Sequence, residues 1–165
     1  MRKGTSGSAS TIVQATPEQV YDTVSDVTRV PEWSPECVGG RWVGGATGPE
    51  VGARFEGRNR RGPVRWRTRS KVVAAERPRE FAFATAAPIY GELARWSYEI
   101  EPGDQEGTSR LTERYEILRD LPKPIIFFEK RMLRVPDREL DLQHNLEVSV
   151  ERVREVIEAD QPRVG

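Results

Sequence analysis

The stretch ARFEGRNRRGPVRWRTRSKVVAA, residues 53–75, decides the fold. Apolar or small residues alternate in it with charged ones on both sides of the Gly62-Pro63 pair, which is typical of two β-strands joined by a turn. Successive side chains of a strand point to opposite faces. The stretch therefore predicts strands over Ala53–Arg60 and Val64–Ala75, each with one charged face in water and one face turned inward.

The same two-residue period continues on both sides of this hairpin, and it is interrupted by glycine and proline clusters. It predicts five more strands, for a total of seven. Their expected bounds are Ser10–Ala15, Cys37–Val43, Glu80–Thr85, Glu92–Glu101 and Thr108–Ile117.

Two short helices are expected after the first strand. Thr16-Pro17-Glu18-Gln19 has the pattern of a capping box, with proline at the first helical position. Asp26 is a second candidate cap, in front of Val27–Val30.

A long amphipathic helix is expected at the C-terminus, ending at about Ala159. Its apolar positions recur at helical spacing and form one stripe that suits packing against a sheet. The stripe consists of Leu142, Leu146, Val150, Val153 and Ile157. Together these elements predict an α+β fold, in which a curved antiparallel sheet surrounds the long helix and encloses a cavity.

Length and composition limit the function classes. The 165 residues fit one domain over 1–165 with its core at about 10–159, and disorder is expected only in the first nine residues and after Asp160. The 26 basic residues balance 26 acidic ones, so a chain devoted to nucleic acid is not expected.

The single cysteine and single histidine exclude an internal disulfide, a zinc cluster and the usual histidine-based triads. We expect neither a metal nor a cofactor. Cys37 is expected to be packed and His144 to lie on the surface, opposite the apolar stripe. No apolar run approaches the roughly 20 residues that span a bilayer, and the first residues lack the apolar segment of a secretory signal. A cytoplasmic protein without stable membrane insertion is therefore expected.

Several short stretches resemble the START-like SRPBCC superfamily, in its polyketide cyclase/dehydrase branch as found in high-GC bacteria such as actinobacteria. The resemblance covers about Ser10 to Glu158 and implies the helix-grip fold. It does not imply one function, because this superfamily includes cyclases, lipid carriers, receptors, resistance proteins and RNA-associated toxins. The stretches are DVTRVPEWSPE at 26–36, GGATG at 44–48, GARFEGRN at 52–59, RWSY at 95–98 and LTE at 111–113.

Glu113 is the candidate catalytic residue. It shares a strand face with Leu111 and Ile117, so it turns inward if they do. A buried carboxyl of raised pKa could act as acid or base, helped by Tyr98 or Tyr115. The alternative, which we favour, is a structural ion pair with an arginine such as Arg41.

Inward polar and aromatic side chains are the candidate ligand contacts, because flat rings with a few polar groups suit a polycyclic molecule. Trp33 is expected at the cavity rim, whereas Trp42 fits the core and the cavity equally well. Thr85 is a further inward polar residue. The predicted contacts are Trp33, Phe55, Asn59, Trp66, Thr68, Ser70, Phe83, Trp96, Leu142 and Leu146.

Two features outside the cavity leave alternatives open. Residues 123–134 mix apolar and basic side chains, and could form a lid, touch a membrane surface or, as we favour, pack against the end of the sheet. The arginine ladder of strands 53–60 and 64–75 could bind nucleic acid, although a solvated face paired with acids on neighbouring strands is the favoured interpretation.

The preferred hypothesis is a protein that binds one small hydrophobic or aromatic ligand, such as a lipid or a polyketide-like metabolite, as a carrier or as a sequestering resistance protein. The first alternative is a polyketide cyclase, aromatase or dehydratase that uses Glu113. The second is a growth inhibitor that acts on RNA or ribosomes. A nucleic-acid partner is not expected, and the sequence leaves the oligomeric state open.

Overall fold

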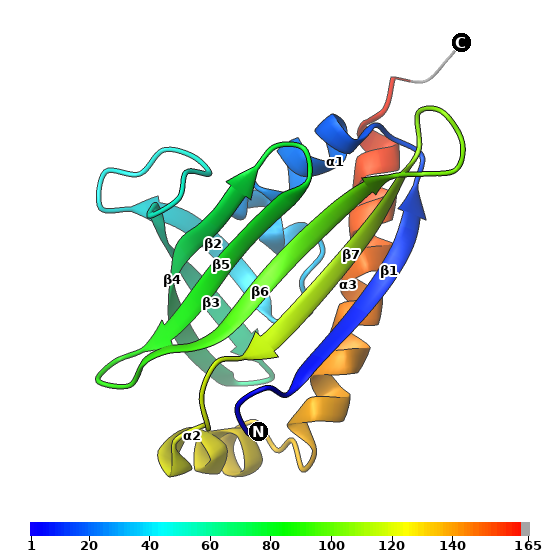
Figure 1. Ribbon diagram of the computed structural model, residues 1–165. Coiled ribbons are helices and arrows are strands. Elements are labelled where there is room, and N and C mark those ends of the chain that lie inside the picture. Colours follow the sequence, from blue (N-terminus) through cyan, green and yellow to red (C-terminus); the bar gives the residue numbers. More distant parts are fainter. Residues whose placement is uncertain (163–165) are drawn as a thin grey trace.

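A seven-stranded antiparallel sheet is the main element of the computed structural model, which describes residues 1–162. Its strand order is β1-β7-β6-β5-β4-β3-β2. The sheet curves around the long helix α3 (Arg138–Asp160) (Figure 1). The α+β helix-grip prediction is therefore confirmed. The strands are β1 (Ser6–Val13), β2 (Cys37–Val43), β3 (Arg54–Arg61), β4 (Val64–Glu76), β5 (Glu80–Ala87), β6 (Gly91–Pro102) and β7 (Ser109–Ile117).

Two short helices follow β1, as predicted: α1 (Pro17–Val24) and the 3-10 helix η1 (Val27–Glu32). The capping box is present, because the Gln19 amide donates to the Thr16 hydroxyl at 3.3 Å and the Thr16 amide donates to the Gln19 side chain at 2.9 Å. Asp26 caps η1 by accepting a hydrogen bond from the Thr28 amide at 3.1 Å.

Helix α3 buries the stripe that its spacing predicts, with Leu146 and Val153 among its most buried residues. The C-terminal half of α3 packs in an apolar cluster with α1, η1 and β5 to β7. Its N-terminal half packs in a second cluster, which includes Leu93 and Ile117. The sheet therefore meets α3 through two apolar regions.

The first strand lies earlier than expected. Strand β1 covers Ser6–Val13 rather than Ser10–Ala15, and it pairs with β7 from Ser6 opposite Glu116 to Val13 opposite Ser109. The expected disorder of the first nine residues is wrong for this part, because backbone pairing with β7 does not need apolar side chains. Of the tail expected to be disordered, residues 163–165 lie outside the described residues.

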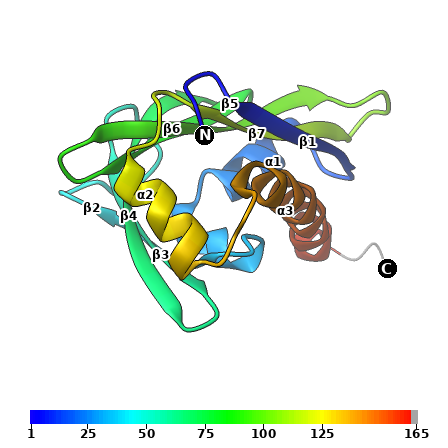
Figure 2. The same ribbon diagram turned by 90° about the horizontal axis from the view of Figure 1, so that it is seen from below.

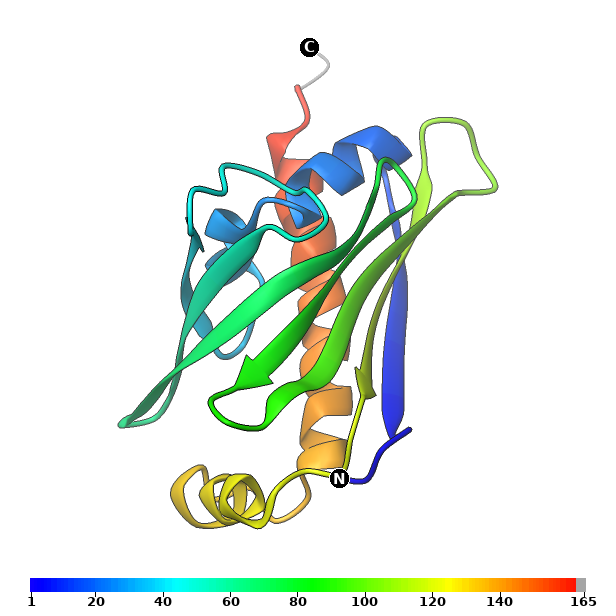
Figure 3. The ribbon, with the colours of Figure 1, turned by 60° about the vertical axis from the view of Figure 1, so that its left-hand side comes forward.

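The segment after β7 forms α2 (Lys123–Phe127) and the π-helical turn η2 (Phe128–Met132). Figure 2 shows this segment crossing the end of the molecule between the sheet and the start of α3. It caps the end toward which the β5–β6 turn also points (Figure 3). None of the helices within residues 1–162 is long and apolar enough to cross a membrane.

Candidate functional site

A cavity of about 400 Å³ lies between the inner face of the sheet and the start of α3. Strands β3 to β7 supply most of its wall, and α2 and η2 border it at the end of the molecule. The wall is mainly apolar, with Phe55, Phe83, Leu93, Ile117 and Leu142 among its residues.

Four hydroxyl and amide side chains on the cavity wall satisfy one another in two pairs. The Asn59 side-chain amide donates to the Thr68 hydroxyl at 3.3 Å, and the Ser70 and Thr85 hydroxyls lie 3.1 Å apart. Gly57 leaves room beside this group, because a Cβ atom there would lie 2.7 Å from the Thr68 hydroxyl oxygen. The pairs offset the cost of burying these groups without closing the space in front of them.

Glu113 is a buried polar group on this wall that belongs to neither pair. It is 7% exposed and lies directly opposite Tyr98 in the register of β6 and β7. Burial raises the pKa of Glu113 from 4.5 to about 7, and the polar side chains of Ser149 and Tyr98 only partly offset this rise. Within residues 1–162 its Oε2 atom has no hydrogen-bond partner. A carboxyl group with a pKa near neutrality can both donate and accept a proton at physiological pH.

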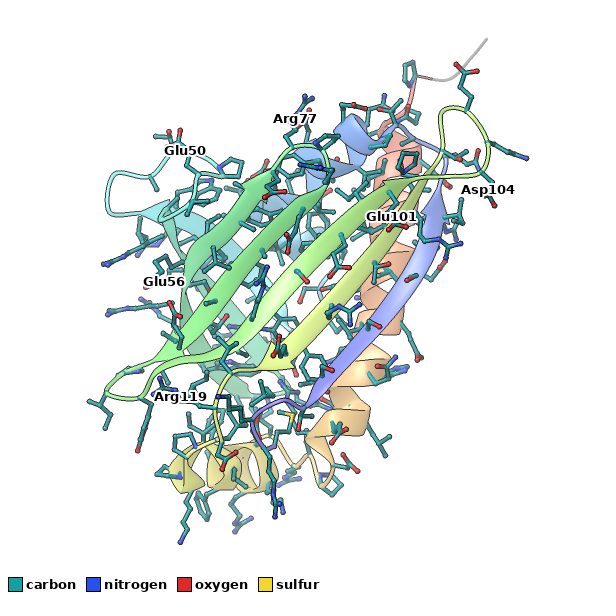
Figure 4. The ribbon with its side chains drawn as sticks, viewed as in Figure 1. Glu50, Glu56, Arg77, Glu101, Asp104 and Arg119 are labelled. Atoms are coloured by element: carbon teal, nitrogen blue, oxygen red, sulfur yellow. The ribbon has the colours of Figure 1, made fainter. Side chains whose placement is uncertain are left out.

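The predicted ion pair between Glu113 and Arg41 is wrong. Arg41 pairs with Glu56, its partner across β2 and β3, at 3.3 Å on the outer side of the sheet. Figure 4 labels Glu56 on this side. The inner and outer faces of a sheet are separated by its backbone, so a side chain of one face cannot reach the other. In the described part of the chain, Glu113 forms no salt bridge.

Trp33 is not at the cavity rim, contrary to the prediction. It is fully buried, at 0% exposure, in the apolar cluster that includes Val24 and Val27. Its indole Nε1–H donates to the Tyr98 hydroxyl oxygen at 3.2 Å. The 3-10 helix η1 ends at the preceding residue and turns Trp33 into the core, where it supports the cavity wall from behind.

Two other predicted site residues, Tyr115 and Leu146, are buried but do not line the cavity. The Tyr115 ring lies over Gly7 of β1, where an added Cβ atom would be 2.7 Å from it and 2.8 Å from the Gln143 side chain. Strand β1 and helix α3 thus cover Tyr115, and its ring packs against that of Trp96, which does line the cavity, with centroids 5.7 Å apart. Leu146 lies in the same apolar cluster as Tyr115, one turn further along α3 than Leu142.

The other predicted site residues do line the cavity. They are Phe55, Asn59, Trp66, Thr68, Ser70, Phe83, Trp96, Tyr98, Glu113 and Leu142. Trp42, for which core and cavity were equally expected, packs edge-on against Phe55 with ring centroids 5.6 Å apart and does not line the cavity.

An ionic cluster at the cavity mouth was missed by the sequence analysis. Arg138 Nη1 donates to Glu36 at 2.7 Å and to Asp141 at 2.6 Å, and Arg61 Nη2 donates to Asp141 at 2.7 Å. Arg138 Nε lies 3.7 Å from Glu129 Oε1, and burial raises the pKa of Glu129. The cluster joins the start of β2, the end of β3, η2 and α3. Its sequence signal was the spacing of Arg138 and Asp141, three residues apart in the first turn of a helix.

Cys37 and His144 do not add chemistry to the site. The Cys37 thiol donates to the Gly39 carbonyl at 3.3 Å, and burial raises its pKa, which disfavours the reactive thiolate. His144 is exposed on α3, as predicted. Residues 1–162 contain no group of three or more histidine, cysteine or acidic side chains that could hold a metal ion.

The profile of one protein family matches residues 5–158 of this chain, and the family is described as polyketide cyclase / dehydrase and lipid transport. The chain belongs to this family. The recognition made from the sequence motifs is thereby confirmed. A search of curated proteins finds no match to the chain.

Solved structures agree with this family assignment. The Polyketide_cyc-like protein Cgl2372 from Corynebacterium glutamicum is 32% identical over 97% of this chain and 95% of its own, with a TM-score of 0.63. A START superfamily protein from Mycobacterium smegmatis shares the fold at 15% identity and a TM-score of 0.69, over 94% of this chain and 99% of its own. Protein TTHA0849 from Thermus thermophilus shares it at 17% identity and a TM-score of 0.70, over 96% and 100%.

Proposed function

We propose that this family member binds one apolar or polycyclic small molecule, such as a lipid or a polyketide-like metabolite, and acts as a carrier or a sequestering protein. The observation that carries the proposal is the cavity of about 400 Å³ with its mainly apolar wall. Binding sites for small molecules typically have about 300–1,000 Å³ and a few placed polar groups. The cavity has both properties.

The wall favours a flat ligand. Trp66, Trp96 and Phe83 offer ring faces and edges, and the Asn59–Thr68 pair offers hydrogen-bonding atoms beside them. Aromatic side chains provide large contact areas that change little in conformation on binding. The family description, which names lipid transport, supports a ligand of this kind.

Native mass spectrometry of the gently purified protein tests this proposal, followed by extraction and identification of any bound molecule. We expect one apolar molecule per chain, or stoichiometric uptake of an added aromatic polyketide or fatty acid. A protein that stays empty after both kinds of ligand have been offered would contradict the proposal.

A second candidate function is supported by Glu113. Its carboxyl is buried, has no ion pair among residues 1–162, has a pKa of about 7 and faces the cavity. Burial raises the pKa of Tyr98 well above its usual value, so its phenol stays protonated and can donate a hydrogen bond. We infer that these two groups could serve a polyketide cyclase or dehydratase. Glu113 would accept a proton from a carbon next to a carbonyl and return it to the oxygen that forms or leaves.

The Glu113→Gln variant separates the two candidates. For a cyclase or dehydratase, turnover should fall by about 100-fold or more while the affinity for the ligand changes little, because only proton transfer is lost. For a carrier, the variant should keep its ligand and its transfer activity. The matched control is Glu116→Gln, which changes an exposed glutamate on the same strand.

A further inference from the structure

Large apolar side chains are exposed at the end of the molecule that α2 and η2 cover. Phe127 is 64% exposed, Met132 is 50% exposed and Ile89, in the β5–β6 turn, is 94% exposed. Leu140, in the first turn of α3, is 70% exposed. Exposed apolar side chains that gather at one site usually mark an interaction surface. We refer to Ile89, Phe127, Met132 and Leu140 as the apolar tip.

Basic side chains gather beside Phe127 and Met132 of the apolar tip, whereas Leu140 is flanked in sequence by the acidic residues Glu139 and Asp141. Residues 119–134 carry five basic and two acidic side chains, whereas the whole chain has a net charge of zero. One of the two acids, Glu129, turns inward and faces Arg138. The basic residues of this segment are all exposed: Arg119, Lys123, Lys130, Arg131 and Arg134. Positive charge is therefore concentrated on the outside of residues 119–134, around α2 and η2.

The β5–β6 turn is tied to the segment that leads into α2. The Arg119 guanidinium donates to the Tyr90 carbonyl oxygen at 2.6 Å and so ties the turn to the segment that leads into α2. Figure 4 labels Arg119 at this end of the sheet. Ile89 has a φ of 63°, a left-handed conformation that β-branched residues disfavour. The turn thus holds the Ile89 side chain in water, where packing does not offset the cost of this backbone conformation.

The same segment presents a second apolar side to the cavity. Ile125, Phe128 and Leu133 line the cavity, and the Phe128 and Trp66 rings pack edge-on with centroids 6.0 Å apart. Phe127 and Met132 do not line it. Only residues 123–134 therefore lie between the cavity and a partner that contacts the apolar tip.

We propose that the apolar tip docks on an anionic membrane surface, so that the cavity loads or unloads its ligand at the bilayer. This inference rests on the proposed function, because it gives the cavity its source of ligand. The apolar side chains would enter the boundary between headgroups and acyl chains, and the surrounding basic side chains would contact anionic headgroups. A second copy of the chain fits this surface poorly, since it would bring two sets of like charges together. Nucleic acid would satisfy the charges but leave Phe127 and Met132 without an apolar partner.

Flotation with vesicles tests the proposal. The full chain is mixed with vesicles of phosphatidylcholine alone or with about one-third phosphatidylserine, and the bound fraction is measured at low and at physiological salt. We expect binding to the anionic vesicles only, and weaker binding at higher salt. The F127S/M132S and K130Q/R131Q variants should each bind about tenfold more weakly, because each loses buried apolar area or contacts with anionic headgroups.

Matched controls come from the rest of the surface. Val51→Ser changes a side chain that is 69% exposed in the β2–β3 loop, and R65Q/R67Q removes two exposed arginines from the outer face of β4. Both controls should bind anionic vesicles like the unchanged protein. Equal loss in R65Q/R67Q and K130Q/R131Q would overturn the proposal, because binding would then follow overall charge and not the apolar tip.

Two further measurements separate this proposal from the proposed function. Uptake of a fatty acid in solution, measured by native mass spectrometry without vesicles, reports on the cavity and should be equal in F127S/M132S and the unchanged protein. Ligand uptake without vesicle binding would overturn the membrane proposal and leave ligand binding intact. Vesicle binding without any ligand uptake would overturn the proposed function and, with it, the loading role of the apolar tip. Analytical ultracentrifugation should show no self-association. A dimer abolished by F127S/M132S, in a protein that ignores vesicles, would assign the apolar tip to a second copy.

Discussion

Glu113 lies directly opposite Tyr98 across β6 and β7, and the Tyr98 hydroxyl accepts a hydrogen bond from the buried Trp33 indole at 3.2 Å. The three side chains connect the apolar core to the cavity wall. Because the register of two strands places the carboxyl beside the phenol, the position of Glu113 depends on the sheet and not on a mobile loop. A rigid position of this kind suits a group that orients a ligand or moves a proton.

Glu113 should make the stability of the protein depend on pH. Its pKa is about 7 in the folded chain and near 4.5 when exposed, so the folded state binds an additional proton between these values. The stability is therefore highest when Glu113 is protonated, and falls as the pH rises through this window. The Glu113→Gln variant has no titrating group at this position, so its stability does not fall in this way as the pH rises. Its free energy of unfolding relative to the unchanged protein should rise by about 3 kcal/mol between about pH 4 and about pH 8.

Chemical denaturation at both pH values measures this difference. The comparison between pH values removes the constant effect of burying a glutamine amide, and Glu116→Gln controls for the loss of one negative charge from the same strand. An equal difference between Glu113→Gln and the unchanged protein at both pH values would show that Glu113 is not held in the buried, unpaired state described above.

Trp33 and Tyr98 should be coupled in stability. Tyr98→Phe leaves the buried Trp33 Nε1–H without its acceptor, which costs about 1–3 kcal/mol. Trp33→Phe loses the same bond and some core packing, so it should be at least as destabilising. The double variant should lose less than the sum of the two single losses, because the bond can be removed only once. Urea denaturation of the four proteins measures the coupling, and fully additive losses would argue against the hydrogen bond.

The sequence predicted the helices and strands better than it predicted which parts of the chain cover each side chain. Alternation within 53–75 identified the inner face of β3 and β4, and half of the predicted residues that line the cavity follow from it. Trp33 and Tyr115 were misplaced because period and composition tell which face is apolar, but not what covers it. Helix η1 turns Trp33 into the core, and β1 and α3 cover Tyr115. Such coverage depends on elements that are distant in sequence.

The ionic cluster around Arg138 illustrates a second limit of prediction from sequence. Arg138 and Asp141 are visible as a helical pair, but their partners Glu36 and Arg61 come from the first half of the chain, at the start of β2 and the end of β3. In the same way, Glu113 could be predicted to turn inward from Leu111 and Ile117 alone. Whether it would meet an arginine there depended on the faces of β2 and β3, and Arg41 turned out to lie on the outer one.

Arg138 should matter more for stability than an arginine on the exposed side of the same helix. Its side chain is 13% exposed and lies between Glu36, Asp141 and Glu129. Arg138→Met would leave the half-buried Glu129 without a cation and leave Glu36 and Asp141 with Arg61 alone, which should cost about 3 kcal/mol. Arg154 also bridges two glutamates, but on the surface of α3, so Arg154→Met should change the stability little. Thermal unfolding of both variants gives the comparison, and equal effects would contradict the importance of burial.

Filling the cavity should abolish ligand binding without unfolding the protein. Ala94 lines the cavity on β6 and is only partly buried, so a larger side chain at this position can enter the open space. Ala94→Phe should reduce the uptake of an apolar ligand by about tenfold or more, because the new ring occupies volume that the ligand needs. Ala159→Phe adds the same ring to an exposed position on α3 and should bind ligand normally. Titration with anilinonaphthalene sulfonate measures both, with circular dichroism as the check on folding. If a folded Ala94→Phe protein binds as well as the unchanged one, the ligand lies elsewhere than between the sheet and α3.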